Sequence, residues 1–196
     1  MPLYSIDGKQ MLFAHVPKAG GTTVEFALDA HCVGLLDRKF RGRFFPCSPQ
    51  HFHAEILMAI LDQSKISYAF MVVRHPVARL VSEYKWRKQH FGLTDGFSSW
   101  VENAIRKFKG HRFATDNHLR PMVEYRLPDC EVFKLEDGLD RVWSRLLEVF
   151  PTVIIAPNPR RKMASPPDDI FDPPAEEILA LIRDTYAADF AAFGYE

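Results

Sequence analysis

Apolar residues along the chain gather in short runs that alternate with helical stripes. Four runs are rich in β-branched and aromatic side chains: 11–16, 68–73, 130–135 and 152–156. Consecutive positions within them are mostly apolar, which is typical of strands buried on both faces of a parallel sheet. The pattern therefore predicts four central strands.

Apolar residues spaced three and four apart predict the helices between these runs. The predicted helices cover 54–62, 77–89 and 97–108, and two further stripes run from Leu139 to Phe150 and from Leu179 to Phe193. Strands that alternate with helices favour an α/β fold with a parallel sheet covered by helices. A chain of 196 residues suits one hydrophobic core, so we expect a single domain over 1–196.

Two segments fit neither pattern. Residues 38–53 mix basic, aromatic and proline residues, and residues 156–174 are rich in proline and carry three consecutive basic residues. Long segments of this kind are either functional binding loops or disordered. The first is interpreted as a binding loop, and for the second both interpretations stay open.

Charge excludes some partners. The chain has 25 Lys and Arg residues against 25 Asp and Glu residues, so no overall field favours nucleic acid or an anionic membrane, and any anion site must be local. No apolar stretch approaches the roughly 18 residues of a membrane span, and the first residues are polar rather than signal-like. Cys32, Cys47 and Cys130 are widely spaced, which favours reduced thiols and a cytoplasmic location over a zinc site.

The segment "HVPKAGGTTVE", residues 15–25, joins the first predicted strand to a helical pattern. Its two glycines allow the backbone to approach an anion closely, and Thr22 and Thr23 add hydroxyl donors. Lys18 lies at the carboxyl end of the strand, where α/β folds bind ligands. The alternative is a tight turn with a threonine cap. The predicted anion-binding residues are Lys18, Ala19, Gly20, Gly21, Thr22 and Thr23.

This loop differs from a nucleoside triphosphate site. The pattern G-x-x-x-x-G-K-[ST] is absent, and the second predicted strand ends at Arg74, where such an enzyme needs an acid for Mg²⁺. A cation there repels a metal and attracts a second anion. On the following helix, Arg79, Ser82 and Trp86 share a face opposite the apolar stripe. The sequence thus predicts a site for two anions without a metal.

At these residues the chain resembles the sulfotransferases that use 3′-phosphoadenosine 5′-phosphosulfate (PAPS), of the carbohydrate type related to heparan sulfate 2-O- and 6-O-sulfotransferases. "HVPKAGGTTVE" is similar to their 5′-phosphosulfate loop, and "VVRHPVARLVSEY" is similar to their 3′-phosphate motif. The resemblance implies a three-layer α/β sandwich akin to the P-loop nucleotide kinases. It implies that Lys18 and residues 19–23 hold the phosphosulfate, and that Arg74 and Ser82 hold the 3′-phosphate.

Three further segments extend the resemblance. "QHFHAEI" implies that His53 is the catalytic base, with His51 as an auxiliary, and Glu55 is expected to raise the pKa of His53. "PRRKMAS" is similar to a late loop that closes over the donor, which implies cofactor contacts for Arg161, Lys162 and Ser165. "DNHLRPMVEY" has Met122 where the family usually has Gln. Candidate contacts to the acceptor are His51, Arg79, Tyr84, Trp86, His118 and Arg120.

The implied reaction moves a sulfuryl group from PAPS to a hydroxyl of a carbohydrate or a small molecule. His53 would remove the hydroxyl proton, and Lys18 would stabilise the leaving bisphosphate. Two other functions stay open: a small ATP-dependent kinase, and a relative that binds the nucleotide or a sulfated glycan without catalysis. The kinase would need ATP and Mg²⁺, whereas the sulfotransferase would bind 3′,5′-adenosine bisphosphate without a metal.

Overall fold

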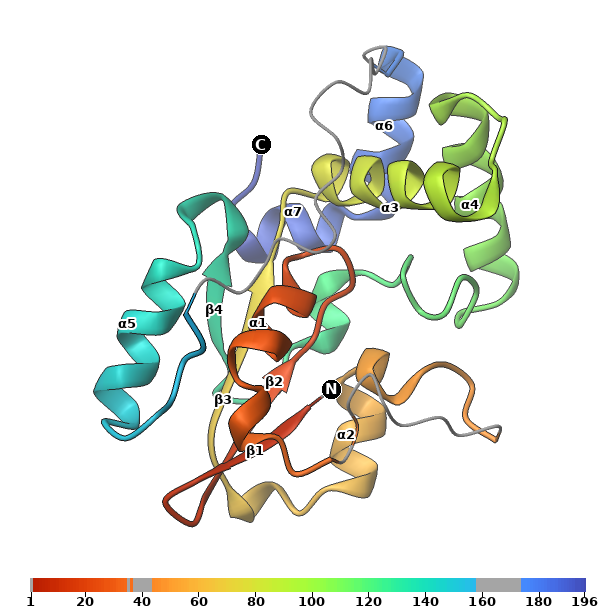
Figure 1. Cartoon of the computed structure of the whole chain (residues 1–196). Helices are drawn as coiled ribbons and strands as arrows, with labels where there is room; N and C mark the ends of the chain where they lie inside the picture. Colours follow the sequence, from red (N-terminus) through yellow and green to blue (C-terminus); the bar gives the residue numbers. More distant parts are fainter. Residues whose placement is uncertain (1, 35, 37–43, 158–173) are drawn as a thin grey trace.

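The computed structural model describes residues 2–34, 36, 44–157 and 174–196. Within them, four strands form one sheet in the order β1 (Leu3–Ile6), β2 (Lys9–Ala14), β3 (Ile66–Val73) and β4 (Glu131–Lys134). The pairs β2–β3 and β3–β4 are parallel, and β1 pairs with β2 in the antiparallel sense (Figure 1). The predicted α/β class with a central parallel sheet is confirmed, except that β1 joins the sheet in the antiparallel sense.

Helices surround this sheet. The α-helices are α1 (Gly21–Ala27), α2 (Ala54–Ile60), α3 (Pro76–Phe91), α4 (Phe97–Gly110), α5 (Asp140–Val149), α6 (Glu176–Thr185) and α7 (Ala187–Phe193). Short 3₁₀ helices are η1 (Asp29–His31), η2 (Pro49–His51), η3 (Gln63–Lys65), η4 (Met122–Tyr125) and η5 (Leu135–Asp137). In the described part of the chain, no helix is long and apolar enough to cross a membrane.

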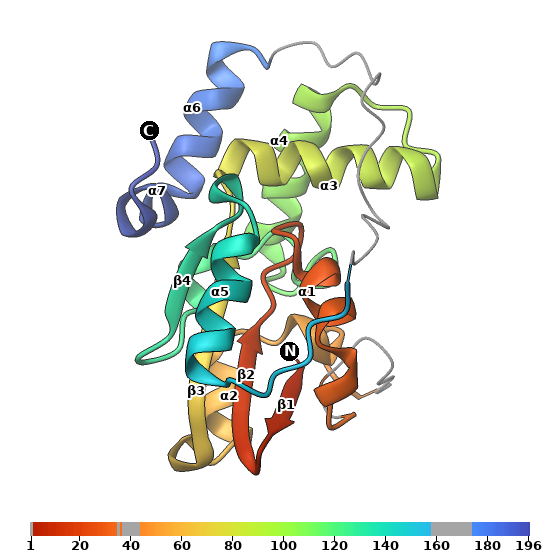
Figure 2. The ribbon, with the colours of Figure 1, turned by 60° about the vertical axis from the view of Figure 1, so that its left-hand side comes forward.

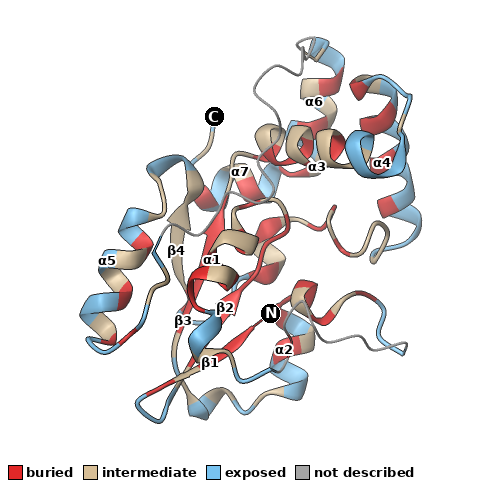
Figure 3. Cartoon of the chain, viewed as in Figure 1, coloured by how far each residue is buried: buried red, intermediate tan, exposed pale blue. Residues whose placement is uncertain are grey.

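Alternate side chains of each strand point to opposite faces of the sheet, and each face is covered by its own layer of helices. Met11 and Phe13 belong to the apolar cluster that includes residues of α1 and α5, whereas Leu12 and Ala14 belong to the cluster that includes residues of α2, η4 and α7. Figure 2 shows α1 and α5 over the same face of the sheet. Buried residues are concentrated in β2 and β3 (Figure 3), so the sheet is the middle of three layers.

A third apolar cluster joins α3, α4 and α6. These helices lie beyond the carboxyl ends of the parallel strands, at the top of Figure 1. The cluster contains Leu80, Trp100 and Ile182, all buried. Together α3, α4 and α6 form a layer, called here the helical wall, beside the carboxyl ends of β2 and β3, where the two predicted motifs lie.

The predicted strand over 152–156 is wrong. The main chain there bonds to the α1 side of the molecule instead of a strand: the Ala156 N–H donates to the Ala27 oxygen at 2.9 Å, and the Ile154 N–H donates to His31 Nε2 at 2.7 Å. Ile154 is 62% exposed, so this apolar run is not a buried strand. With these donors already bonded, the segment extends along α1 without joining the sheet.

Strand β1 was not among the predicted strands. It forms a hairpin with β2 through Asp7 and Gly8, which have φ values of 50° and 75°. An Asp-Gly pair with two positive φ angles is a favoured two-residue hairpin turn. The signal was present in the sequence as Asp-Gly between Leu3–Ile6 and Lys9–Ala14.

The long C-terminal stripe, predicted as one helix, forms two. They meet at Tyr186, whose φ of −112° breaks the helix, while its buried hydroxyl donates to the Leu119 oxygen at 2.8 Å. In α7, Asp189 accepts the N–H groups of Met122 and Val123, each at 2.9 Å. These bonds between segments distant in the sequence fix α7 against η4.

Candidate active site

The two predicted donor motifs meet at one edge of the sheet. Since β2 and β3 are parallel neighbours, their carboxyl ends lie side by side, and the loop before α1 adjoins the start of α3. Arg74 Nη1 donates to the main-chain oxygen of Lys18 at 3.3 Å. Both side chains are partly buried. This contact joins two motifs that are 56 residues apart in the chain.

The loop before α1 needs its glycines for space and conformation. Lys18 and Gly20 have φ values of 67° and 83°, in the left-handed region, and α1 begins at Gly21. A Cβ added at Gly21 would lie 2.3 Å from His15 Nε2. His15 is itself held by a hydrogen bond between its Nδ1 and the carboxylate of buried Glu25 on α1. The helix therefore starts in direct contact with an imidazole ring.

The side chain of Lys18 lies against Trp86 of α3, with Nζ 5.1 Å from the centre of the ring. Burial lowers the pKa of Lys18, and the charges of Arg74 and Arg87 act in the same direction, while Glu83 opposes them. Lys18 is thus a partly desolvated cation beside an aromatic face. Trp86, predicted as an acceptor contact, lies next to the predicted leaving-group lysine.

Two other predicted acceptor contacts serve packing in this structure. Arg79 is 2% exposed, and its guanidinium donates to the main-chain oxygens of Pro17, His118 and Arg120 at 3.2, 2.6 and 2.7 Å. Tyr84 is buried in the helical wall, and its hydroxyl donates to the Asp95 oxygen at 2.8 Å. Arg79 was predicted to face a ligand, but its guanidinium instead bonds to three main-chain oxygens that need a hydrogen-bond donor.

Three histidines beside the loop each contact a carboxylate through Nδ1. His15 bonds to Glu25, His51 bonds to Asp116 at 2.9 Å, and His118 bonds to Glu83 at 2.7 Å. Their rings lie edge to face in sequence, with centres 5.3 Å apart for His15 and His51 and 4.6 Å apart for His51 and His118. The row continues to Trp86, whose ring centre is 6.1 Å from that of His118.

The charges in this row follow from burial and pairing. Burial and the neighbouring charge of His118 lower the pKa of His51 to about 3, against the opposing bond to Asp116. Burial favours the neutral form of Glu83, but the combined attraction of His118, Arg87 and Lys18 lowers its pKa to about 2. At neutral pH the row therefore contains a neutral His51 and an ionised Glu83.

His51, Asp116 and His118 also offer ligand atoms within 4.8 Å of one another, close enough to hold a metal ion. Asp116 is already occupied by two hydrogen bonds, one with His51 and one from the Ser48 N–H at 2.6 Å. These bonds hold the pKa of the Asp116 carboxyl below its usual range despite its burial. The arrangement satisfies the carboxylate without a metal.

His53, the base implied by the resemblance, lies at the N-terminus of α2. Its Nε2 is 3.5 Å from the exposed carboxylate of Glu55, and its ring centre is 5.7 Å from that of Phe113. Among the described residues, no atom bonds to its buried Nδ1. Burial, followed by the charge of Arg120, lowers the pKa of His53, and Glu55 raises it by less. The expected increase in this pKa is wrong, because burial outweighs the neighbouring acid.

The remaining predicted site residues are Ser82, Arg120 and the three residues of the late loop. Arg120 is buried and bonds to Asn117 and Glu124, and Ser82 is partly buried on α3 one helical turn before Trp86. The Arg74 N–H donates to Met122 Sδ at 3.5 Å, so the residue that replaces the usual Gln contacts the second motif. Arg161, Lys162 and Ser165 lie outside the described residues.

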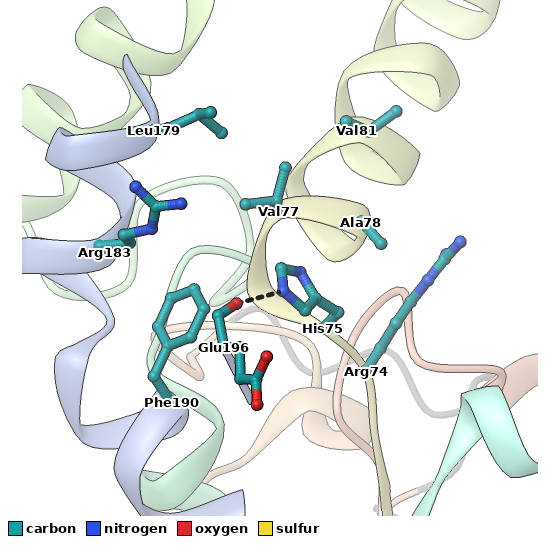
Figure 4. A pocket seen from close by; sticks show the side chains of 9 residues that line it. All are labelled: Arg74, His75, Val77, Ala78, Val81, Leu179, Arg183, Phe190 and Glu196. Carbon is teal, nitrogen blue, oxygen red and sulfur yellow. Dashed lines mark hydrogen bonds between the residues drawn. The ribbon is translucent and has the colours of Figure 1, made fainter. Parts of the chain in front are cut away.

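A cavity of about 540 Å³ adjoins the second motif on the side of α6 and α7. Figure 4 shows Val77, Ala78, Leu179 and Phe190 around it, with Arg74 at its border and directed away from Phe190. His75 Nε2 contacts the Glu196 oxygen at 3.1 Å. The cavity is thus mainly apolar, and the guanidinium of Arg74 points from its border toward the loop side of α3.

Comparisons with known proteins bear on this site. The sequence profile of the Sulfotransferase family matches residues 3–196, which include both motifs and the row of histidines. No curated protein and no solved structure matches the chain. Since the match extends over nearly the whole sequence, the chain belongs to the Sulfotransferase family and is a sulfuryl-transferring enzyme.

Proposed function

We propose that the protein transfers the sulfuryl group of PAPS to a hydroxyl group of a carbohydrate or a small molecule. The observation that carries this proposal is the contact between Arg74 and the main chain of Lys18. It brings a cation at the end of β3 to the loop after β2, so one nucleotide with separate 5′ and 3′ anionic groups can reach both motifs.

The residues at this edge fit an anionic nucleotide. Lys18 and Arg74 are both partly buried, and burial lowers the pKa of each. Within the described part of the chain, neither side chain has a carboxylate within ion-pair distance, although desolvated cations are usually paired. A phosphosulfate at Lys18 and a 3′-phosphate at Arg74 and Ser82 would supply the missing negative charge.

Sulfuryl transfer requires an attacking oxygen, the sulfur and the leaving oxygen in line. Lys18, with the amides and hydroxyls of residues 19–23, would hold the phosphosulfate and stabilise charge on the leaving bisphosphate. PAPS supplies the activated sulfuryl group, and the protein positions it. A histidine would accept the proton; the resemblance implies His53, while the contacts favour a different histidine, as argued below.

The acceptor would lie beside Trp86. This ring and the imidazole of His118 form a partly buried aromatic and polar surface next to Lys18. Saccharides offer hydroxyl groups for hydrogen bonds and apolar C–H faces for aromatic rings, so a carbohydrate hydroxyl fits this surface. A cytoplasmic location stays a prediction, consistent with three free cysteines at Cys32, Cys47 and Cys130.

Thermal unfolding with nucleotides tests the donor. In the presence of EDTA, 3′,5′-adenosine bisphosphate is expected to raise Tm, because a ligand that binds only the native state stabilises it by about 2.7 kcal/mol at 100 times its Kd. Adenosine 5′-monophosphate, which lacks the 3′-phosphate, is the matched control and should give a smaller shift. Stabilisation by ATP with Mg²⁺ but not by the bisphosphate would favour the kinase alternative. Bisphosphate binding without sulfuryl transfer to any acceptor would favour a non-catalytic relative.

A further inference from the structure

His118 and Glu83 form a hydrogen-bonded pair close to the predicted donor site. This histidine is not His53, the base that the family resemblance implies. His118 lies beside Trp86, and Trp86 lies beside Lys18. Glu83, on α3, contacts His118 through Oε2 at 2.7 Å and Arg87 through Oε1 at 2.6 Å, and its charge also acts on Lys18. The pair is therefore electrostatically coupled to the predicted leaving-group lysine.

Hydrogen bonding determines which nitrogen of His118 can accept a proton. Glu83 is ionised at neutral pH and can only accept hydrogen bonds, so the proton of a neutral His118 lies on Nδ1. Nε2 then carries the lone pair. A carboxylate that orients an imidazole and stabilises its charged form is the arrangement by which enzymes use histidine as a base.

The two alternative histidines lack one of these properties. His51 is oriented by Asp116 but is 5% exposed, and its pKa is lowered to about 3, so it is a weak proton acceptor. His53 has a buried Nδ1 without a partner among the described residues, and its near acid, Glu55, is exposed. The His118 side chain is 11% exposed, against 6% for the side chains of His51 and His53.

The main chain of His118 is also fixed relative to the loop. Arg79 donates to the His118 oxygen and to the oxygen of Pro17, the residue before Lys18. A base must be held within hydrogen-bond reach of the group it deprotonates, and a single side chain that joins both segments keeps their separation constant. The buried guanidinium thus connects the main chain of His118 to the loop before α1, called here the donor loop.

We propose that His118 is the catalytic base of this enzyme and that Glu83 is its positioning residue. The proposal rests on the proposed PAPS-dependent transfer. As the acceptor oxygen forms its bond to sulfur, the bond from sulfur to the phosphate oxygen breaks, and its electron pair stays on the bisphosphate. The hydroxyl proton moves to Nε2 of His118, and the resulting imidazolium is stabilised by Glu83.

Several charged groups set the pH response of this base. Glu83 contacts the ring directly, and His51 faces it at the edge. The other charged or titratable residues near Glu83 and His51 are His15, Lys18, Arg79, Arg87 and Asp116. Transfer should therefore decrease at low pH, and loss of the Glu83 carboxylate should move that limb of the pH–rate profile to lower pH.

Carbethoxylation with diethyl pyrocarbonate tests the position of His118 without knowledge of the acceptor. The reagent modifies neutral imidazole, and mass spectrometry locates the product. We expect 3′,5′-adenosine bisphosphate with inorganic sulfate to slow modification of His118 at least several-fold and to leave exposed His111 unchanged. Equal rates at His118 with and without these ligands would place it outside the site and overturn the proposal, while a thermal shift by the bisphosphate would still support the donor.

Kinetics of the variants test the chemical role. His118→Gln should lower kcat by about 100-fold or more, as expected for loss of a general base. The increase in Tm caused by the bisphosphate should be the same in this variant as in wild type. Glu83→Gln should lower kcat less and shift the acidic limb of the pH profile. His111→Gln is the matched control. The proposal is overturned if His118→Gln retains more turnover than His53→Gln, or if EDTA abolishes wild-type turnover, which would indicate a metal at His51, Asp116 and His118.

Discussion

Nε of Arg79 lies 3.2 Å from the main-chain oxygen of Pro17, so a side chain of α3 holds the residue that precedes Lys18. The same guanidinium bonds to the oxygens of His118 and Arg120. One buried cation therefore joins the donor loop to the segment that carries the proposed base. Its charge is solvated by three carbonyl dipoles, and no carboxylate of the described residues lies within ion-pair distance of it.

Replacement of Arg79 should therefore lower the free energy of unfolding more than replacement of a surface arginine does. In Arg79→Ala, three carbonyls lose their partner, two of them in buried bonds and one in a partly buried bond, and each unsatisfied buried polar group costs about 1–3 kcal/mol. We expect the free energy of unfolding, measured in urea, to decrease by about 3 kcal/mol or more. Arg106→Ala, at an exposed position of α4, is the control and should change little. A decrease as small as that of the control would show that water replaces the guanidinium.

Arg74→Ala should weaken donor binding before it affects chemistry. A hydrogen bond to a charged group contributes about 1.5–3 kcal/mol, so the Kd for 3′,5′-adenosine bisphosphate should rise by roughly tenfold to a hundredfold. Calorimetric titration measures this directly. Adenosine 5′-monophosphate should lose much less affinity, since it lacks the 3′-phosphate. Equal losses for both nucleotides would contradict the assignment of Arg74 to that phosphate.

Gly21→Ala should disturb the donor loop. The added Cβ would lie 2.3 Å from His15 Nε2, and the ring has little freedom to move because Glu25 holds it. We expect a lower Tm and a smaller thermal shift by the bisphosphate. Gly110→Ala is the matched control, because nothing lies within 4 Å of a Cβ at that helical position. There Ala should maintain or slightly raise Tm. If Gly21→Ala left both Tm and the thermal shift unchanged, the His15 ring would have to be able to move away from α1.

The ionised Glu83 should make stability depend on acid pH. Its pKa is lowered from 4.5 to about 2 in the folded protein, so the folded state binds fewer protons than the unfolded state between these values. The stabilisation is complete above pH 4.5 and is lost as the pH falls toward about 2. Urea unfolding at several pH values should show a shallower acid dependence for Glu83→Gln than for wild type. Glu177→Gln, exposed on α6, should keep the wild-type slope.

Much of the fold could be predicted because its signals are local. Consecutive apolar residues located β2, β3 and β4, and three- and four-residue periods located α3, α4 and α5 within a few residues. The same reasoning failed at 152–156, where an apolar run has its donors bonded to Ala27 and His31 instead of a strand. A period cannot show which partner a backbone group will find.

The sequence by itself determined the order and spacing of the two motifs, the residue types that face an anion, and the family. Glycine, lysine and arginine carry that information locally, through allowed φ angles and charge. Only the tertiary structure decided that the buried Arg79 joins two distant segments and that the C-terminal stripe breaks at Tyr186. It also decided that His118 lies beside Trp86, whose ring faces Lys18. These outcomes depend on carbonyls, carboxylates and rings that are distant in the chain, and they become neighbours only when the core is packed.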